Sequence, residues 1–341
     1  MYREIRTQVE AWASALDAVK AAEPAIGTLF GSDARAREVL FLGAGSSYYL
    51  GLAAAVFWGR RGFKANALPA SEQLFHADGY PYRQPPIVVA ISRSGATTET
   101  RDAVRTLRAA GSPCISISTE ADSPIATEAD LALVVAGGRE SSIVQTRSFS
   151  GHLVATQALA AVAASDAPSV AALDDLPRAY QGWLERAEVI AQGLASRFER
   201  AYFLGTGERW GIAMEGALKL KEASLTETEA FQTFEFRHGP KSMIDDQTLV
   251  MGLVGGPHAG LELDVMREAR ELGARVVVVG EDLASLDGLE AVSFGSGLPE
   301  DVALPYHLPL LHLLAYHRAV AKRLDPDHPR HLDFAVLLEP T

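Results

Sequence analysis

The stretch VLFLGAGSSYYLGLAAA, residues 39–55, decides the fold, because a related stretch, AYFLGTGERWGIAMEGA, follows at residues 201–217. In each, a short apolar run meets a glycine-punctuated turn and then a helical pattern, which is the beginning of a βαβ unit. A second pair, LRAAGSPCISIS at 107–118 and ARELGARVVVVG at 269–280, keeps the same offset of 162 residues. The sequence therefore predicts two parallel-sheet domains in tandem.

Four apolar runs in the first half predict its strands: Val39–Leu42, Ile87–Ile91, Cys114–Ser118 and Leu131–Val135. Continuous apolar character is typical of a parallel sheet that is covered on both faces. One covering helix is predicted over 99–110, because Gly111 follows it as a C-cap. We expect a doubly wound α/β fold, with each domain a three-layer sandwich of the flavodoxin-like or Rossmann-like kind.

The predicted organisation has five parts. They are an N-terminal helix (1–24), a first domain (25–170), a linker (171–185), a second domain (186–325) and a C-terminal tail (326–341). The N-terminal helix is amphipathic, and its pattern fits packing on the chain's own core and on a partner subunit equally well.

Composition excludes several classes of function. The 341 residues carry a net charge of −12, which disfavours nucleic acid as a partner because no excess of Lys and Arg can displace counterions. The single cysteine, Cys114, excludes an intrachain disulfide framework and favours a cytoplasmic location. The N-terminus does not have the pattern of a signal peptide, and the apolar stretch 153–164 is too short to span a bilayer.

The segment Ser92-Arg93-Ser94-Gly95-Ala96-Thr97-Thr98 joins a predicted strand to a predicted helix. A helix N-terminus favours an anion, and hydroxyl groups add donors without adding charge. Thr97 or Thr98 could instead only cap the helix. The equivalent segment of the second half, residues 254–260, has no hydroxyl, so we predict that the first half alone carries a phosphate site.

The turn at residues 43–48 resembles a dinucleotide fingerprint only in part. The motif GxGxxG needs glycine at 48 and 210, where Tyr48 and Trp210 stand, so we expect no nucleotide cofactor. Ser46 and Ser47 then become candidate sugar or phosphate ligands, with packing of a tight turn as the alternative.

Glu215, Lys219 and Glu222 lie at i, i+4 and i+7 of a predicted helix, which places them on one face. The small and apolar neighbours predict that the helix is buried, where charges are costly unless they are paired or functional. His238 follows in a Gly-Pro turn and is a candidate acid-base group at neutral pH.

The order of GAGSS, SRSGATT, ESSIVQTRSF, EGALKLKE, EFRHGP and LLAYHRAVAKRLDPDHPRHL resembles the sugar isomerase (SIS) domain family over about residues 35–335. Within that family it is most similar to the isomerase half of the glucosamine-6-phosphate synthases. The resemblance implies a phosphosugar isomerase without a metal or other cofactor, working as a homodimer.

The resemblance also implies roles for individual residues. Substrate binding falls on a set of mostly hydroxyl-bearing residues: Ser46, Ser47, Ser92, Arg93, Ser94, Thr97 and Gln145. By the same resemblance, Glu222 is the residue that transfers the proton, and Lys219 is the active-site lysine. His238 is the residue that opens the ring, and in relatives this histidine comes from the neighbouring subunit.

The sequence departs from the family pattern at several places. No glutaminase segment precedes the match, so we expect no glutamine hydrolysis. Arg93 stands where the synthases have glutamine, Ala96 where they have glutamate, and Phe334 where they have a tail lysine that engages the sugar carbonyl. Phe334 cannot form an imine.

Three functions stay open at this point. The first is isomerisation of a hexose or amino-sugar phosphate, with or without deamination; the others are deglycation of a fructosamine phosphate and non-catalytic sensing of a sugar phosphate. Joint presence of Lys219, Glu222 and His238 favours an enzyme. His307, His312 and His317 are spaced by five, which does not align metal ligands on a helix, so we expect them to serve packing.

Overall fold

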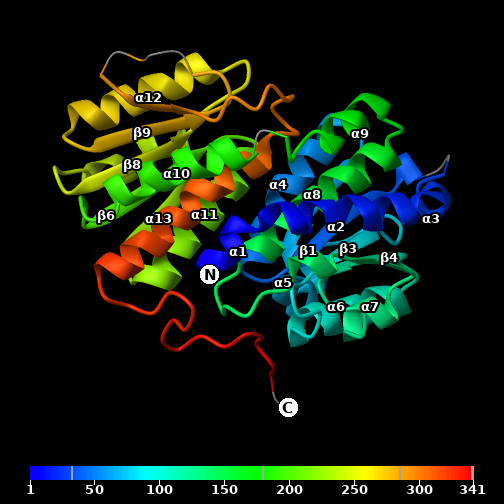
Figure 1. Ribbon diagram of the computed structural model, residues 1–341. Helices are drawn as coiled ribbons and strands as arrows, with labels where there is room; N and C mark the ends of the chain where they lie inside the picture. The colour runs from blue at the N-terminus through cyan, green and yellow to red at the C-terminus, as the bar shows by residue number, and fades with distance from the viewer. Residues whose placement is uncertain (32–33, 179, 284–285, 287, 339–341) are drawn as a thin grey trace. The chain divides into compact units, whose positions relative to one another are not determined.

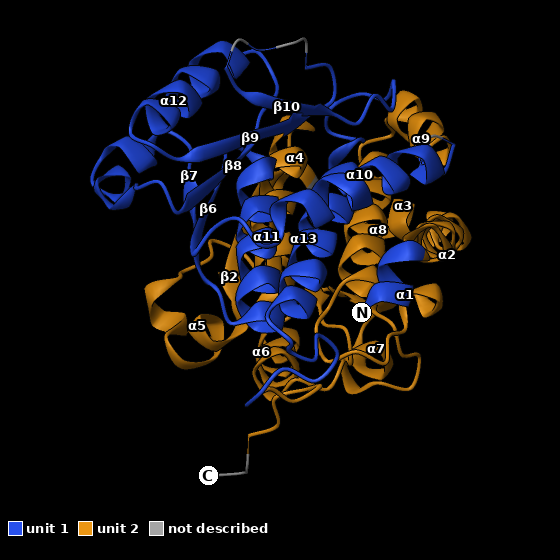
Figure 2. Cartoon of the chain, turned by 60° about the vertical axis from the view of Figure 1, so that its left-hand side comes forward, with its two compact units in different colours: residues 1–6, 176–331 blue, residues 7–175, 332–341 orange. Residues whose placement is uncertain are grey.

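The computed structural model describes residues 1–341 except 32–33, 179, 284–285, 287 and 339–341. Residue 179 of the predicted linker and the last three residues of the predicted tail thus lie outside the described residues. The chain divides into two compact units (Figure 2). Unit 1 consists of residues 1–6 and 176–331, and unit 2 of residues 7–175 and 332–341.

Unit 2 is built on a parallel sheet of five strands in the order β2-β1-β3-β4-β5. The strands are β1 (Glu38–Gly43), β2 (Lys64–Pro69), β3 (Ile87–Ile91), β4 (Cys114–Ser118) and β5 (Leu131–Val134). Every residue of β3 and β4 is buried, because helices cover both faces of the sheet. The four strands predicted for this half are confirmed.

Helices α2, α4 and α8 lie on one face of this sheet, and α6 and α7 lie on the other (Figure 1). The helices of unit 2 are α2 (Gln8–Ala21), α3 (Glu23–Leu29), α4 (Ser46–Arg60), α5 (Ala70–Phe75), α6 (Thr98–Ala109), α7 (Pro124–Glu128), α8 (Arg147–Ala163) and α9 (Ala167–Asp174). Short 3₁₀ turns lie at Ala34–Ala36, Ala77–Gly79 and Ala136–Gly138.

Unit 1 has a second parallel sheet, in the order β10-β9-β8-β6-β7. Its strands are β6 (Arg200–Gly205), β7 (Glu227–Gln232), β8 (Thr248–Leu253), β9 (Arg275–Gly280) and β10 (Glu290–Ser293). Its helices are α1 (Tyr2–Arg6), α10 (Tyr180–Leu194), α11 (Glu208–Ser224), α12 (Ala259–Glu271) and α13 (Leu308–Ala321). Its 3₁₀ turns lie at Glu235–Arg237, Pro240–Met243 and Leu304–His307.

The two sheets have the same strand order, because the second sheet, followed from β7 to β10, has the order β7-β6-β8-β9-β10, which corresponds to β2-β1-β3-β4-β5. Strands β1 and β6 begin at residues 38 and 200, and helices α4 and α11 begin at residues 46 and 208, a constant offset of 162. Helix α12 covers one face of the second sheet, and α10, α11 and α13 lie on the other (Figure 1). The predicted class, two doubly wound α/β units in tandem, is confirmed.

In each sheet the strand order reverses between two neighbouring strands, β1 and β3 in unit 2 and β6 and β8 in unit 1. The loops that leave the carboxyl ends of such a pair diverge to opposite faces and open a crevice, where α/β proteins bind ligands. The loops after β1 and β3 are those that carry the predicted phosphate ligands.

The predicted helix over 1–24 is divided into α1 and α2 by Thr7, whose backbone is not helical. Helix α2 buries Ala11, Trp12, Ala15 and Val19 and packs on α8 of its own unit. The Trp12 indole donates to the Ser150 hydroxyl there. The two alternatives for this segment were packing on the chain's own core and packing on a partner subunit, and α2 packs on the core of its own unit. No helix among the described residues is long and apolar enough to cross a membrane.

Candidate functional site

The loop after β1 turns sharply and places Ser46 and Ser47 in the first turn of α4. Both serines are buried. A Cβ atom at Gly43 would lie 2.7 Å from the backbone and Cβ of Ser47, so only glycine allows this close approach. The glycine of the turn thus brings two hydroxyl-bearing residues to the crevice of unit 2.

The loop after β3 is shaped by its own serines. The Ser92 hydroxyl accepts a hydrogen bond from the Gly95 N–H (3.1 Å), and the Ser94 hydroxyl accepts one from the Ala96 N–H (3.2 Å). Gly95 has a φ of +64°, in the region that favours glycine. Because both oxygens accept, the hydroxyl protons of Ser92 and Ser94 can be donated to another group.

Thr97 occupies the N-cap of α6, but its side chain makes no capping hydrogen bond. Its hydroxyl instead lies 3.4 Å from that of Ser92. The first N–H of the helix, at Thr98, donates to the carbonyl of Val336 in the C-terminal segment (3.3 Å). Capping is therefore not the role that the structure gives Thr97.

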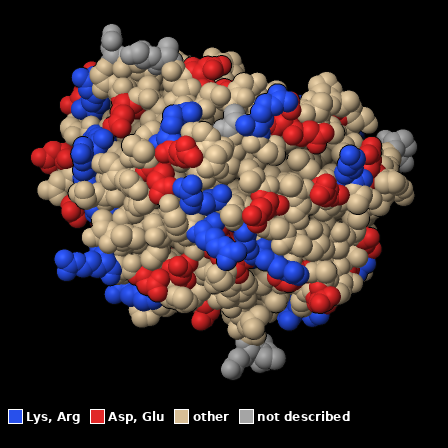
Figure 3. Space-filling model, in the orientation of Figure 1, with Lys and Arg blue, Asp and Glu red and all other residues tan. Residues whose placement is uncertain are grey.

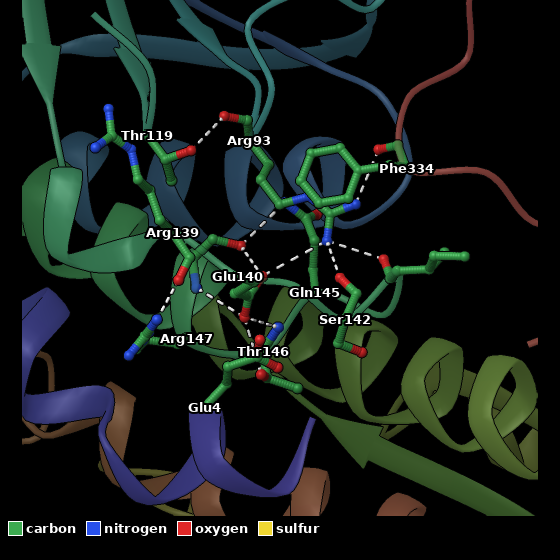
Figure 4. A network of polar contacts seen from close by, with 12 residues as sticks. Glu4, Arg93, Thr119, Arg139, Glu140, Ser142, Gln145, Thr146, Arg147 and Phe334 are labelled. Atoms are coloured by element: carbon green, nitrogen blue, oxygen red, sulfur yellow. Dashed lines mark hydrogen bonds and ion pairs between the residues drawn. The ribbon is translucent and has the colours of Figure 1, made fainter. Parts of the chain in front are cut away.

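Arg93 joins three segments of unit 2, as Figure 4 shows. Its guanidinium donates to the carbonyls of Ser142 (3.1 Å), Ile143 (2.9 Å) and Phe334 (2.9 Å). The ring of Phe334 lies 3.8 Å from the guanidinium carbon, a cation-π contact. Only 6% of Arg93 is exposed. In this arrangement Arg93 holds the loop after β3, the 140–147 loop and the tail together.

Glu140 organises the loop that carries Gln145, and sequence reasoning missed it. Its fully buried carboxylate accepts hydrogen bonds from the N–H groups of Thr146 (2.7 Å) and Ser148 (3.1 Å) and from both of their hydroxyls. Gln145 itself donates to the Ser148 hydroxyl (3.3 Å). A single acidic residue in a polar loop gives no sign of such a role, because its partners are fixed only on folding.

Helix α11 brings Lys219 and Glu222 together in unit 1. The Lys219 Nζ is 2.5 Å from Glu222 Oε2 and 3.7 Å from Glu215 Oε1. Lys219 and Glu215 are buried, whereas a fifth of the Glu222 side chain is exposed and Lys221 faces solvent. The predicted single face and the predicted burial of the helix are both confirmed.

His238 lies in the exposed turn that follows Glu235–Arg237 at the end of β7. In the described part of this single chain its imidazole makes no hydrogen bond, so it does not contact Lys219 or Glu222 in that way. The predicted phosphate ligands belong to unit 2, and Lys219, Glu222 and His238 belong to unit 1.

Three other histidines are buried. Burial, together with the nearby charges of Arg93, Arg209 and Lys219 respectively, lowers the pKa of His152, His307 and His312 to about 3. Each is therefore neutral at pH 7. Among the described residues, no three His, Cys, Asp or Glu side chains are grouped as a metal site would require.

The crevice of unit 1 is filled by its own side chains, which sequence reasoning also missed. The buried carboxylate of Glu262 accepts from the Gly255 N–H (3.1 Å) and from the Thr206 hydroxyl. Arg209 lies against it (3.4 Å) and donates to Glu300 (2.7 Å). An alignment of the two halves at the 162-residue offset would have revealed Glu262, because it falls opposite Thr100 of the first half.

Comparison with known proteins identifies the family. Residues 34–162 and 195–286 match the SIS domain family. The chain is 32% identical to a glutamine–fructose-6-phosphate aminotransferase of Aeropyrum pernix, over 99% of this chain and 57% of that protein. The chain thus spans a little over half the length of this curated relative.

Two solved structures share the fold over nearly their whole length. Glucosamine-6-phosphate deaminase from Thermotoga maritima is 29% identical, with a TM-score of 0.78 over 98% of this chain and 100% of that one. Tagatose-6-phosphate ketose/aldose isomerase from Escherichia coli is 23% identical, with a TM-score of 0.84 over 99% and 95%. The second likeness concerns the fold alone.

Proposed function

The chain belongs to the SIS domain family, and from that premise we propose that it interconverts the aldose and ketose forms of a hexose phosphate or an amino-sugar phosphate. The observation that carries the proposal is the pair formed by a buried lysine and a partly exposed carboxylate, Lys219 and Glu222, 2.5 Å apart. A cation next to a carboxylate that solvent can reach is suited to moving a carbon-bound proton while a neighbouring oxygen gains negative charge.

Binding of the phosphate group is assigned to the loop after β3. Ser92, Ser94 and Thr97 offer hydroxyl protons at the N-terminus of α6, where the helix dipole favours an anion. Lys and Arg alternate with Asp and Glu on the face shown in Figure 3, so a local set of neutral donors, rather than a broad positive field, would select the ligand. Ser46 and Ser47 are proposed to contact the same ligand from the loop after β1.

Proton transfer is assigned to Glu222. Its carboxylate would take the proton from C2 of the opened aldose, leaving an enediolate, and return it to C1 to give the ketose. Lys219 would stabilise the enediolate oxygen, and His238 would help to open the ring. The same carboxylate serves both halves of the reaction, so no external oxidant or reductant is needed.

An amino sugar would give a different end product at the same site. If C2 of the aldose carries an amine, the proton shift produces an imine at C2, which water hydrolyses to the ketose and ammonia. The likeness to glucosamine-6-phosphate deaminase supports including this branch.

Hydrogen exchange with deuterated solvent tests the proposal. We expect at least one sugar phosphate from a panel to exchange its C1 or C2 hydrogen, and ammonia to appear when that sugar carries an amine. Glu222→Gln should abolish exchange while stabilisation by the sugar phosphate persists, and Glu227→Gln, at an exposed position of β7, should behave as the parent. Tight binding of a sugar phosphate without any hydrogen exchange would contradict the proposed enzyme and favour a non-catalytic sensor.

We further propose that the protein works as a homodimer in which His238 serves the partner's site. Its exposure and its lack of a hydrogen bond in the single chain support this assignment. Mixing inactive Glu222→Gln and His238→Ala chains should restore part of the activity, because one hybrid site then holds both groups. A protein that sediments only as a monomer would contradict the assignment.

A further inference from the structure

A small hollow of about 120 Å³ lies next to Glu222 in unit 1. It forms where α11 and α13 end, since Leu225 leaves α11 with a φ of +50° and Lys322 Nζ donates to the Leu225 carbonyl (3.0 Å). Besides Glu222, the hollow is lined mainly by the segment Leu324–Arg330 that follows α13. It has room for about four waters, at roughly 30 Å³ each, and so for the reacting end of a sugar.

Two side chains of this segment form a pair on the wall of the hollow. His328 Nδ1 is 3.0 Å from Asp325 Oδ2, and the other oxygen of Asp325 accepts from the Asp327 N–H (2.9 Å). These hydrogen bonds, from the backbone and from His328, lower the pKa of Asp325, so its carboxylate is charged at neutral pH. A carboxylate that binds one ring nitrogen of a histidine fixes the orientation of the ring and leaves the other nitrogen for a substrate.

The proposed isomerisation needs a second proton carrier. Moving the double bond from C1–O1 to C2–O2 transfers one proton between carbons and another from O2 to O1. Glu222 can carry the first, and Lys219, which forms an ion pair with Glu222, is assigned to stabilising the oxygen. A histidine on the same hollow is suited to the second, because an imidazole can both give and take a proton.

We propose that His328, oriented by Asp325, is the acid-base group that moves the proton between O2 and O1 of the opened sugar. The inference rests on the function proposed above. As Glu222 removes the C2 hydrogen, Lys219 stabilises the negative charge that develops on O1, and the imidazolium then donates its proton to O1 and converts the enediolate to an enediol. The neutral ring then takes the O2 proton as Glu222 protonates C1, so both groups return to their starting states.

The groups on the hollow explain why this assignment falls on His328 rather than His238. The charged or titratable side chains that line it are Glu222, Asp325, His328 and Arg330, and His238 is not among them. About 72% of the His328 side chain and 60% of that of Asp325 are exposed, so a substrate can reach both. Ring opening by His238 and transfer between oxygens by His328 are then separate steps.

Three variants of the full-length protein test the inference on whichever sugar phosphate the parent turns over. His328→Gln should lower kcat at least about 100-fold, the lower end for a lost general acid-base, with KM within about threefold of the parent. Asp325→Asn should lower kcat about tenfold and move the alkaline limb of the pH-rate profile, on which the imidazolium is lost, to lower pH, because the imidazolium loses its counter-charge. His331→Asn is the matched control, since His331 is exposed, lies outside the hollow and has a φ of +65° that asparagine tolerates.

The outcomes separate this inference from the proposed function. His328→Gln with the kcat and pH profile of the parent and of His331→Asn would overturn the role of His328 alone. A parent protein that turns over no sugar phosphate would overturn both. Thermal unfolding of each variant, measured in parallel, should match the parent, because His328 and Asp325 are exposed and their loss leaves no cavity.

Discussion

The crevices of the two units are built on the same strand order but are lined by different side chains. In unit 2 the loops after β1 and β3 present the hydroxyls of Ser47, Ser92 and Ser94 at the beginnings of α4 and α6. In unit 1 the same place is taken by Arg209 and Glu262, whose carboxylate accepts from the Gly255 N–H. We propose that unit 2 offers its hydroxyls to an external anion, whereas in unit 1 the Glu262 carboxylate occupies the corresponding place.

The difference between the two crevices is found at two pairs of equivalent residues, which are related by the 162-residue offset. Ser47 corresponds to Arg209, and Thr100 corresponds to Glu262. A carboxylate in the first turns of α12 satisfies the loop N–H and the helix dipole from within. A short threonine at the equivalent place in α6 cannot reach the loop in this way. Unit 1 also carries the Lys219–Glu222 pair, on α11.

The largest effect is expected where the internal anion is removed. Glu262→Ala should destabilise unit 1 by about 3–5 kcal/mol, because Arg209 is left as a buried charge without its buried partner. Glu300→Ala, which removes the more exposed partner of the same arginine, should cost about 1 kcal/mol or less. Denaturant unfolding measures both.

Inorganic phosphate sharpens this test. If Glu262 stands in for an external anion, phosphate should stabilise the Glu262→Ala variant more than it stabilises Glu300→Ala. Equal losses of stability in the two variants would contradict the comparison.

A smaller effect is expected in the crevice of unit 2. Ser94→Ala or Thr97→Ala should weaken sugar-phosphate binding by about 1.5–3 kcal/mol, a factor of roughly 10–100 in Kd, since each removes one donor to a charged acceptor. Calorimetric titration provides the measurement. Ala259→Thr places a hydroxyl at the position of unit 1 equivalent to Thr97 and should leave Kd unchanged, because Glu262 fills that crevice. Unchanged binding in both alanine variants would show that the loop is not the anion site.

The smallest effect, counted per unit of pH, concerns the buried histidines, His152 in unit 2 and His312 in unit 1. Burial lowers the pKa of each to about 3, below the ordinary value of 6.5, so the unfolded chain binds more protons than the folded one. Stability is therefore complete above about pH 6.5 and falls as the pH drops toward 3, by about 1.4 kcal/mol per pH unit for each histidine. His152→Gln and His312→Gln should each flatten the dependence of the unfolding free energy on pH. A dependence as steep as that of the parent in both variants would contradict the lowered pKa of these histidines.

Much of the site was visible in the sequence because it depends on local pattern. Continuous apolar runs identify buried parallel strands, and Ile87–Ile91 and Cys114–Ser118 agree with the structure residue for residue. Glycine identifies turns in which the backbone has a positive φ, as at Gly95. The helical spacing of Glu215, Lys219 and Glu222 fixes their common face, whatever surrounds the helix.

The remaining features depend on contacts between residues far apart in the chain, and only the tertiary structure decided them. Phe334 stacks on Arg93, 241 residues away, and its carbonyl accepts from the same guanidinium. Glu262 fills a crevice whose other walls come from β6 and β8, and the hollow at Glu222 exists only because α11 and α13 end side by side. A side chain's hydrogen-bond partners are set by which segments the fold brings within about 3 Å, and no sequence spacing encodes that distance.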